Sequence, residues 1–197
     1  MSVLLKLDAA RKPYVAAGEA KTAGTATAAP VAVDGGRGDA RLATYVKKPA
    51  GEKVEKDWRA AGYTPLKDWL GGDRALPPVL VATDDPLTLD GKLGDVTLIA
   101  IDFAKFSDGR GLSSAALLRK RLGYTHELRA VGDVARDQLF QMARCGFDAF
   151  ELRDGQDVDD ALKAFSDYGD VYQDAADGRA PIFRRRGEAN AAAEKAS

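Results

Sequence analysis

The sequence predicts an α/β domain with an open, mostly parallel sheet of about four to five strands and crossover helices. Three observations support this fold class: a globular composition, short apolar runs of buried-strand type, and helix-like segments between the later runs. Hydrophobic residues make up 45% of the 197-residue chain and charged residues 30%, as is usual for soluble domains. Half of a TIM-like barrel is the alternative arrangement, because so few strand–helix units cannot close a full barrel.

Four segments have the pattern of buried strands. Residues 79–82 and 97–103 are continuous apolar runs, and residues 128–131 and 149–152 are shorter runs that end at similar signals. Segments of helical length follow the later runs. Strands that alternate with helices usually pair in parallel, with each helix crossing over the sheet. We therefore expect the four strands to belong to one parallel sheet.

Three helices are expected after these strands. Ser113 is the predicted N-cap of the first helix, which stops at Gly123. The second is expected over residues 134–145, where Gly146 would end it. The third is expected to begin after Asp157, whose side chain can cap it.

Both ends of the chain have compositions that favour extended or disordered structure. Residues 1–55 are predicted to form an extended or poorly ordered arm, because much of this segment is Ala, Gly and Thr with little apolar surface to bury. Residues 56–174 are predicted to form the α/β domain. Residues 175–197 are predicted to be a disordered or partly helical tail.

Charge and hydropathy exclude two classes of partner. The formal net charge of −1 gives no basic field of the kind that recruits nucleic acid, so we expect no nucleic-acid partner. Apolar runs in the chain are only a few residues long, far short of the roughly 18 residues needed to cross a bilayer. The first residues also lack the apolar core of a signal peptide. We therefore expect a cytoplasmic protein with no membrane partner.

The scarcity of thiols and imidazoles limits metal and redox chemistry. Cys145 and His126 are the only residues of their kinds, so the chain lacks a full set of ligands for a structural zinc ion or an iron–sulfur cluster. No dinucleotide fingerprint is present either. We expect no self-contained metal site, and the cofactor is unknown. Cys145 is expected to be a buried structural residue rather than a nucleophile, and His126 to lie in an exposed loop.

A loop over residues 107–111 is the first candidate site. Ligands of parallel α/β sheets lie beyond the carboxyl ends of the strands, and glycines before a helix N-terminus suit the close approach of an anion. Arg110 would add a fork of donors for an oxyanion. The alternative is a tight turn in which Asp108 and Arg110 pair with neighbouring charges. The candidate anion-binding residues are Lys105, Asp108, Gly109, Arg110, Gly111 and Ser113.

Charged side chains at the other strand ends form the second candidate, a sheet-edge cluster. Its members are Asp102, Asp133, Arg136, Asp137, Gln138 and Arg153. One interpretation is a general acid or base, since a carboxylate buried beside other charges has a shifted pKa. The favoured interpretation is a helix cap with an ion-pair network that fixes helix to sheet.

Three long motifs resemble one known family. The segments IDFAKFSDGRGLS (101–113), LRAVGDVARDQLF (128–140) and RCGFDAF (144–150) are similar to those of the bacterial domain of unknown function 934 family. The resemblance covers roughly residues 58–173. This chain has Ala104 where the family pattern has proline, and Leu112 where it has tyrosine. The second departure removes a hydroxyl from the candidate anion loop.

The resemblance implies a role in assimilatory sulfur metabolism. Members of that family are commonly labelled oxidoreductases of sulfite reduction, and their genes tend to lie beside those for sulfite reductase and phosphoadenylylsulfate reductase. The first hypothesis is therefore an accessory protein of sulfate and sulfite reduction, acting with sulfite reductase or another sulfate-assimilation protein. The second hypothesis is a small-anion-binding enzyme or sensor that uses the loop from Asp108 to Ser113.

Overall fold

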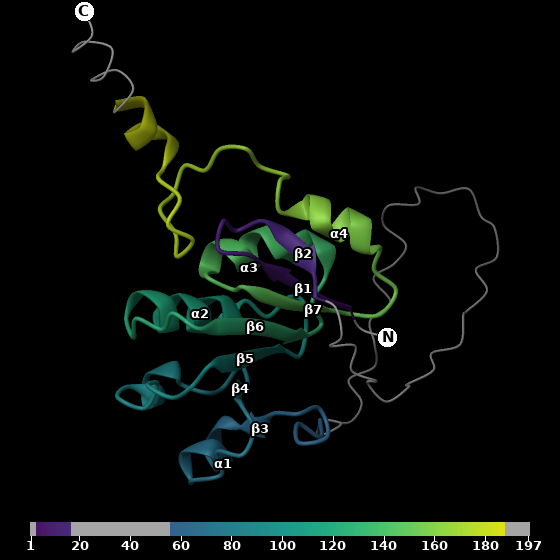
Figure 1. The fold of residues 1–197 in the computed structure, drawn as a ribbon, viewed down its shortest axis with the longest axis vertical. Coiled ribbons are helices and arrows are strands. Elements are labelled where there is room, and N and C mark those ends of the chain that lie inside the picture. Colours follow the sequence, from purple (N-terminus) through teal and green to yellow (C-terminus); the bar gives the residue numbers. More distant parts are fainter. Residues whose placement is uncertain (1–2, 17–55, 188–197) are drawn as a thin grey trace, which may run out of the picture.

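The computed structural model describes residues 3–16 and 56–187. Seven strands in these residues form one sheet in the order β2-β1-β7-β6-β5-β4-β3 (Figure 1). The strands are β1 (Val3–Leu7), β2 (Pro13–Val15), β3 (Thr64–Pro65), β4 (Pro78–Leu80), β5 (Leu98–Phe103), β6 (Glu127–Gly132) and β7 (Ala149–Leu152). The helices are α1 (Leu66–Leu70), α2 (Arg110–Lys120), α3 (Leu139–Cys145) and α4 (Val158–Ala164), with 3-10 turns η1 (Pro86–Leu89) and η2 (Arg136–Gln138).

The predicted open, mostly parallel sheet is confirmed. Strands β3 to β7 run parallel and stand next to one another in chain order. Each connection between neighbouring parallel strands is expected to be right-handed. Because every strand is added on the same side of the one before it, right-handed connections place all the connecting helices on one face of the sheet. The sheet ends at β2 and β3 and does not close into a barrel.

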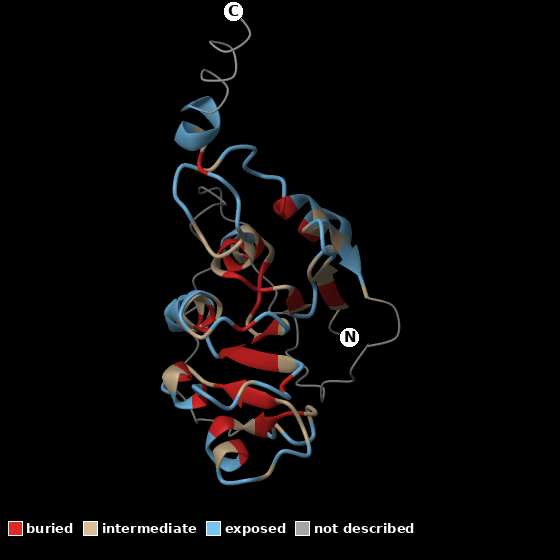
Figure 2. Cartoon of the chain, turned by 60° about the vertical axis from the view of Figure 1, so that its left-hand side comes forward, coloured by how far each residue is buried: buried red, intermediate tan, exposed pale blue. Residues whose placement is uncertain are grey.

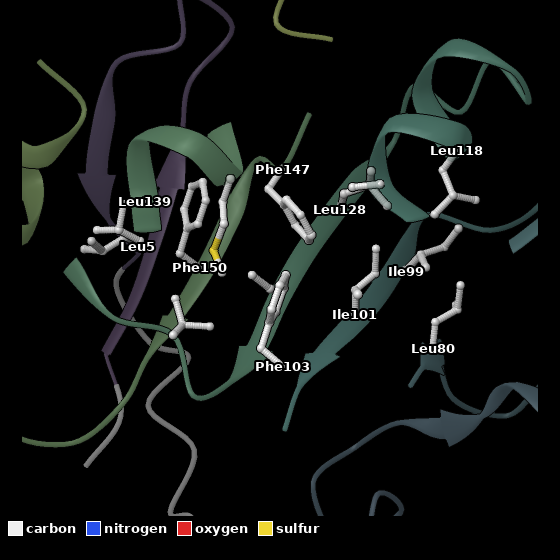
Figure 3. Close-up of a cluster of buried hydrophobic side chains, with 14 of the residues drawn as sticks. Leu5, Leu80, Ile99, Ile101, Phe103, Leu118, Leu128, Leu139, Phe147 and Phe150 are labelled. Atoms are coloured by element: carbon white, nitrogen blue, oxygen red, sulfur yellow. The ribbon is translucent and has the colours of Figure 1, made fainter. Parts of the chain in front are cut away.

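Two hydrophobic clusters lie on opposite faces of the sheet. The larger cluster joins alternate strand residues such as Leu80, Ile101 and Phe150 to apolar residues of all four helices. Figure 3 shows part of this cluster, including Leu118 of α2 and Leu139 of α3. The smaller cluster contains Tyr63, Val79, Ala100 and Val131, and no residue of a helix. The central strands are almost wholly buried, whereas the segment after α4 is mostly exposed (Figure 2). The face without helices is therefore covered, in the described residues, by the segment that leads into β3.

The N-terminal hairpin differs from the predicted arm. Strand β1 pairs antiparallel with both β2 and β7, so part of the predicted arm is an integral part of the sheet. Arg11, in the turn, has a φ of 60°, a conformation that non-glycine residues rarely adopt. Its guanidinium donates to the carbonyl oxygens of Ala143 (2.7 Å) and Phe147 (3.1 Å) and pairs with Asp148. These bonds hold the strained turn against the end of α3. The rest of the predicted arm, residues 17–55, lies outside the described residues.

The first predicted helix begins earlier than expected. Helix α2 starts at Arg110 with Gly109 as its N-cap, so the prediction of Ser113 as the cap is wrong. Asp108 supplies the side-chain acceptor instead, taking a hydrogen bond from the backbone N–H of Arg110 at 3.2 Å. The early start requires glycine at position 111, because a Cβ there would lie 2.8 Å from Cζ of Phe103.

The other two helices fit their signals more closely. The predicted helix over residues 134–145 is divided into the 3-10 turn η2 and the helix α3. It ends at Gly146, which has the left-handed conformation expected of a terminating glycine. The carboxylate of Asp157 accepts from the N–H of Asp160 at 3.0 Å, which confirms the predicted cap of α4.

The segment after α4 is anchored to α3. Arg144 donates two hydrogen bonds to the carboxylate of Asp177, at 3.1 and 3.0 Å, and a third to the carbonyl oxygen of Gln173. The Asp177 side chain is only 4% exposed, so this ion pair is buried. Residues 182–187, within the predicted tail, are helical. Within the described residues, every helix is too short or too polar to span a bilayer.

Candidate functional site

A cleft of about 950 Å³ lies beyond the carboxyl ends of β4 and β5. Its walls combine apolar side chains, among them Trp58 and Val81, with charged groups. The cations are Lys56, Arg59, Lys105 and Arg110, and the carboxylates are Asp57, Asp102 and Asp108. The cleft therefore brings together one predicted member of the sheet-edge cluster, Asp102, with three of the predicted anion-loop residues.

Asp108 and Arg110 form a fork-shaped ion pair within the anion loop. Arg110 Nε lies 3.0 Å from Asp108 Oδ1, and Nη2 lies 2.7 Å from Oδ2. These hydrogen bonds lower the pKa of Asp108 to about 2 and raise the pKa of Arg110. The geometry is that of the tight-turn alternative. An incoming oxyanion would have to compete with Asp108 for the guanidinium.

The carboxylate of Asp108 is expected to titrate near pH 2 and to return towards its ordinary value of 3.8 in an Arg110→Ala variant. Because the pKa is lowered by folding, this group favours the folded state above pH 3.8, and the contribution disappears as the pH falls towards 2. Carbon-13 NMR of the side-chain carboxyl would measure both midpoints. An unchanged midpoint in the variant would mean that Arg110 does not hold the carboxylate in solution.

Asp102 is the buried carboxylate of the cleft. Its neighbours in β5, Ile101 and Phe103, point into the larger core cluster, so the Asp102 side chain points to the opposite face of the sheet, the one without helices. Only 9% of its side chain is exposed, and Oδ1 lies 3.4 Å from the ammonium of Lys56. Burial raises the pKa of Asp102, and the nearby Lys56 partly opposes this effect. Within the described chain Oδ2 accepts no hydrogen bond, so this oxygen has acceptor capacity left for a ligand.

Lys105 is the unpaired cation of the cleft. Arg59 is held by Asp73 at 2.5 Å and by Asp68 at 3.4 Å, and Arg110 is held by Asp108. No carboxylate of residues 3–16 or 56–187 lies within ion-pair distance of the Lys105 ammonium. Lys105 is therefore the cationic side chain here that a ligand can reach without first breaking an ion pair.

Three of the six residues in the sheet-edge cluster, Asp133, Gln138 and Arg153, brace the loop that carries Lys105. Asp133 accepts from Arg153 Nη1 at 2.9 Å and from the N–H of Phe106 at 3.1 Å. Gln138 donates to the carbonyl oxygen of Phe106 at 2.6 Å. Both the N–H and the carbonyl group of Phe106 are thus hydrogen-bonded, which fixes the loop in place. This arrangement agrees with the interpretation of the cluster as a structural ion-pair network. Arg136 lies farther away, paired with Asp160 and Asp167.

The remaining predicted residues do not enter the cleft. Gly111 packs against Phe103 and Ile101, and Ser113 is exposed within α2 rather than at its start. Asp137 lines a separate hollow of about 520 Å³ with Phe140, Tyr168 and Tyr172. Cys145, predicted to be buried, is only partly buried, and this burial raises the pKa of its thiol, the opposite of what a nucleophile requires.

Sequence reasoning did not find Lys56, Trp58 and Arg59 as site residues. They precede β3 and reach the cleft across the face without helices, where Lys56 Nζ lies 4.2 Å from the ring centroid of Trp58. Their only sequence signal is a sudden gain in aromatic residues after position 57. That signal predicts packing onto the domain, not a position beside Asp102.

Fold and site together define an α/β protein with consecutive parallel strands and a polar cleft at their carboxyl ends. A family model described as "Bacterial protein of unknown function (DUF934)" matches residues 79–183. This is more than half of the chain, and the chain belongs to that family. The match begins within β4 and ends in the anchored C-terminal segment, so it covers the braced loop but not Trp58. No curated protein and no solved structure matches the chain.

Proposed function

We propose that the carboxyl-edge cleft binds a small anionic ligand through Lys105, and that the protein acts in sulfate and sulfite reduction as a sensor or a small enzyme. The observation that carries the ligand site is the unpaired ammonium of Lys105 on a loop held by Asp133 and Gln138. A braced loop presents this charge with little loss of conformational entropy on binding. The link to sulfur metabolism rests on the family resemblance.

Arg110 is the second group proposed to meet the anion. It begins α2, whose first-turn N–H groups carry partial positive charge. Asp108 now occupies its fork, and the pair lies at the surface, with Arg110 exposed and Asp108 half-buried. An exposed ion pair contributes little to stability, so a ligand oxyanion can replace Asp108 at small expense in free energy.

Lys105→Ala is expected to abolish ligand stabilisation while leaving the circular dichroism unchanged, because the Lys105 side chain has no ion pair to lose. The measurement is a thermal-shift panel of sulfite, sulfate, phosphate and phosphoadenosine phosphosulfate at fixed ionic strength. A ligand at 100 times its dissociation constant should stabilise the wild type by roughly 2.7 kcal/mol. Lys92→Ala is the matched control, since Lys92 lies outside the cleft. Equal shifts in Lys105→Ala and the wild type would rule out the site.

A second function, docking on a partner enzyme, is favoured by a different surface. Tyr168, Tyr172 and Phe183 are 62%, 74% and 52% exposed. Tyr168 packs against the ring of Phe140 with centroids 4.9 Å apart, and Tyr172 packs against Phe183 with centroids 5.9 Å apart, both in tilted geometry. Exposed aromatic groups of this kind are enriched at protein interfaces. We propose that this surface contacts sulfite reductase or another sulfate-assimilation protein, as an accessory protein would.

Tyr172→Ser is expected to weaken binding to purified sulfite reductase by about tenfold, because an interface aromatic often contributes more than 1 kcal/mol. Surface plasmon resonance at low ionic strength would measure the change. Tyr14→Ser is the control, since Tyr14 is an exposed tyrosine of β2 that does not line the hollow formed by Tyr168 and Tyr172. The same affinity in wild type and Tyr172→Ser, or no binding of the wild type at all, would contradict this accessory role.

A further inference from the structure

One ammonium group already occupies part of the cleft. Lys56 Nζ lies 4.2 Å from the ring centroid of Trp58 and 3.4 Å from Oδ1 of Asp102. An aromatic ring face beside a carboxylate is a favourable environment for an alkylammonium ion, because both the ring quadrupole and the negative charge attract it. Trp58 and Asp102 thus form an ammonium subsite, which a side chain of the protein fills.

From this arrangement we infer that the natural ligand carries an amino group as well as an anion. Its ammonium would take the position of Lys56 Nζ between Trp58 and Asp102, and its oxyanion would meet Lys105. This inference rests on the proposed anion site and names the class of ligand for that site: an amino-bearing organic phosphate, sulfonate or carboxylate.

Asp102 is fixed in place, whereas Lys56 is free to leave. The Asp102 side chain is 9% exposed, and the Lys56 side chain is 47% exposed. On the neighbouring strand Gly132 lies so close that a Cβ there would be 2.6 Å from Asp102 Oδ1. The Lys56 contact of 3.4 Å is long for a charged hydrogen bond, which is usually about 2.7–2.9 Å. A ligand ammonium can therefore replace Lys56 with a shorter bond and also reach Oδ2.

Electrostatics argue against a bare inorganic anion as the ligand. The anion beside Lys105 would also lie near the carboxylates of Asp102 and Asp108, which line the same cleft. Like charges in a partly buried site repel one another. A positive group on the ligand that neutralises Asp102 removes much of this repulsion. The volume of about 950 Å³ likewise leaves room for an organic scaffold between the two charges.

The test compares O-phosphoethanolamine with ethyl phosphate and inorganic phosphate, using the full chain. Chemical shifts of the tryptophan indole N–H groups would follow binding, with Trp58 assigned from a Trp69→Phe variant. O-phosphoethanolamine is expected to bind about tenfold more tightly than ethyl phosphate, as one desolvated ammonium contact predicts. It should also shift the Trp58 signal.

Two variants with opposite expected effects make the test specific. Lys56→Ala should tighten O-phosphoethanolamine binding, because the competing ammonium is gone. Asp102→Asn, which keeps the shape of the side chain, should reduce that affinity to the level of ethyl phosphate. Circular dichroism would verify that both variants are folded.

Each outcome decides between the two proposals. If ethyl phosphate or inorganic phosphate binds as tightly as O-phosphoethanolamine, the amino-bearing class is wrong and the anion site stands. If Lys56→Ala weakens O-phosphoethanolamine, Lys56 binds the ligand directly and the exchange of ammonium groups is wrong. If none of the three probes binds and the panel of sulfur and phosphate anions is also silent, both proposals fail.

Discussion

Replacing Gly132 with alanine is expected to lower the free energy of unfolding by about 3 kcal/mol or more, through overpacking and backbone strain. Gly132 ends β6 directly opposite Phe103 and has a φ of 98°. An alanine Cβ would lie 2.6 Å from the carbonyl oxygen of Phe103 and 2.6 Å from Asp102 Oδ1. Neither neighbour can move easily, because one is backbone and the other is a nearly buried side chain. Urea unfolding followed by circular dichroism would measure the loss.

Gly155→Ala separates crowding from backbone conformation. Gly155 also has a positive φ, 82°, but a Cβ there would meet no atom within 4 Å. Its replacement is expected to destabilise by only about 1–2 kcal/mol, the strain of a non-glycine residue in this region. If both variants lose the same free energy of unfolding, Gly132 does not lie as close to Asp102 in solution as it does in the structure. Gly132→Ala should also disturb ligand binding in the cleft, whereas Gly155→Ala should not.

Asp177→Ala is expected to destabilise the protein by about 3–5 kcal/mol, because it leaves the Arg144 guanidinium buried without its charge partner. Both side chains are less than a tenth exposed. The loss should be visible as a lower urea midpoint and as rapid proteolysis between α4 and residue 187, since Arg144 is the anchor of that segment. Asp170→Ala is the control.

The control removes an exposed ion pair from the same segment. Asp170 pairs with Arg185, and their side chains are 56% and 49% exposed. Such pairs usually contribute about 0–1 kcal/mol, so Asp170→Ala should be almost silent in both assays. If Asp177→Ala is equally silent, the C-terminal segment is not held by its ion pair. The family model extends to residue 183, and contacts other than this ion pair would then have to hold that segment on the domain.

Sequence patterns predicted the parts of the fold whose determinants are local. The apolar runs at β4 to β7 and the stop signal at Gly146 each depend on neighbouring residues. Strand β1 could not be predicted in the same way, because its place in the sheet depends on β7, which lies more than 130 positions later in the sequence. The start of α2 was misplaced because Asp108, not Ser113, accepts the hydrogen bond from the first N–H of the helix, that of Arg110. Both residue types are good caps, and the choice depends on how Gly111 packs on Phe103.

The candidate site was predictable only in the residues that follow the strands directly. The rule that ligands lie beyond the carboxyl ends of parallel strands placed Asp102 and Lys105 correctly at one edge. It could not show that Asp133 turns to the backbone of Phe106 instead of facing the cleft. Nor could it supply Lys56 and Trp58, which arrive from outside the strand–helix repeat. Side-chain direction and long-range docking are the two properties that the pattern does not contain.

The position of β1 has a consequence for how the chain is made. Arg11 and Asp148 are 137 positions apart in sequence, so the first strand must wait until β7 has left the ribosome before it can pair. During that interval β1 lacks its β7 partner and β6 is the open edge of the growing sheet, and unpaired edges readily join other chains. Contacts between such distant residues also slow folding. A nascent chain of this protein is therefore most exposed to aggregation before β7 emerges, and this is the stage at which a chaperone would protect it.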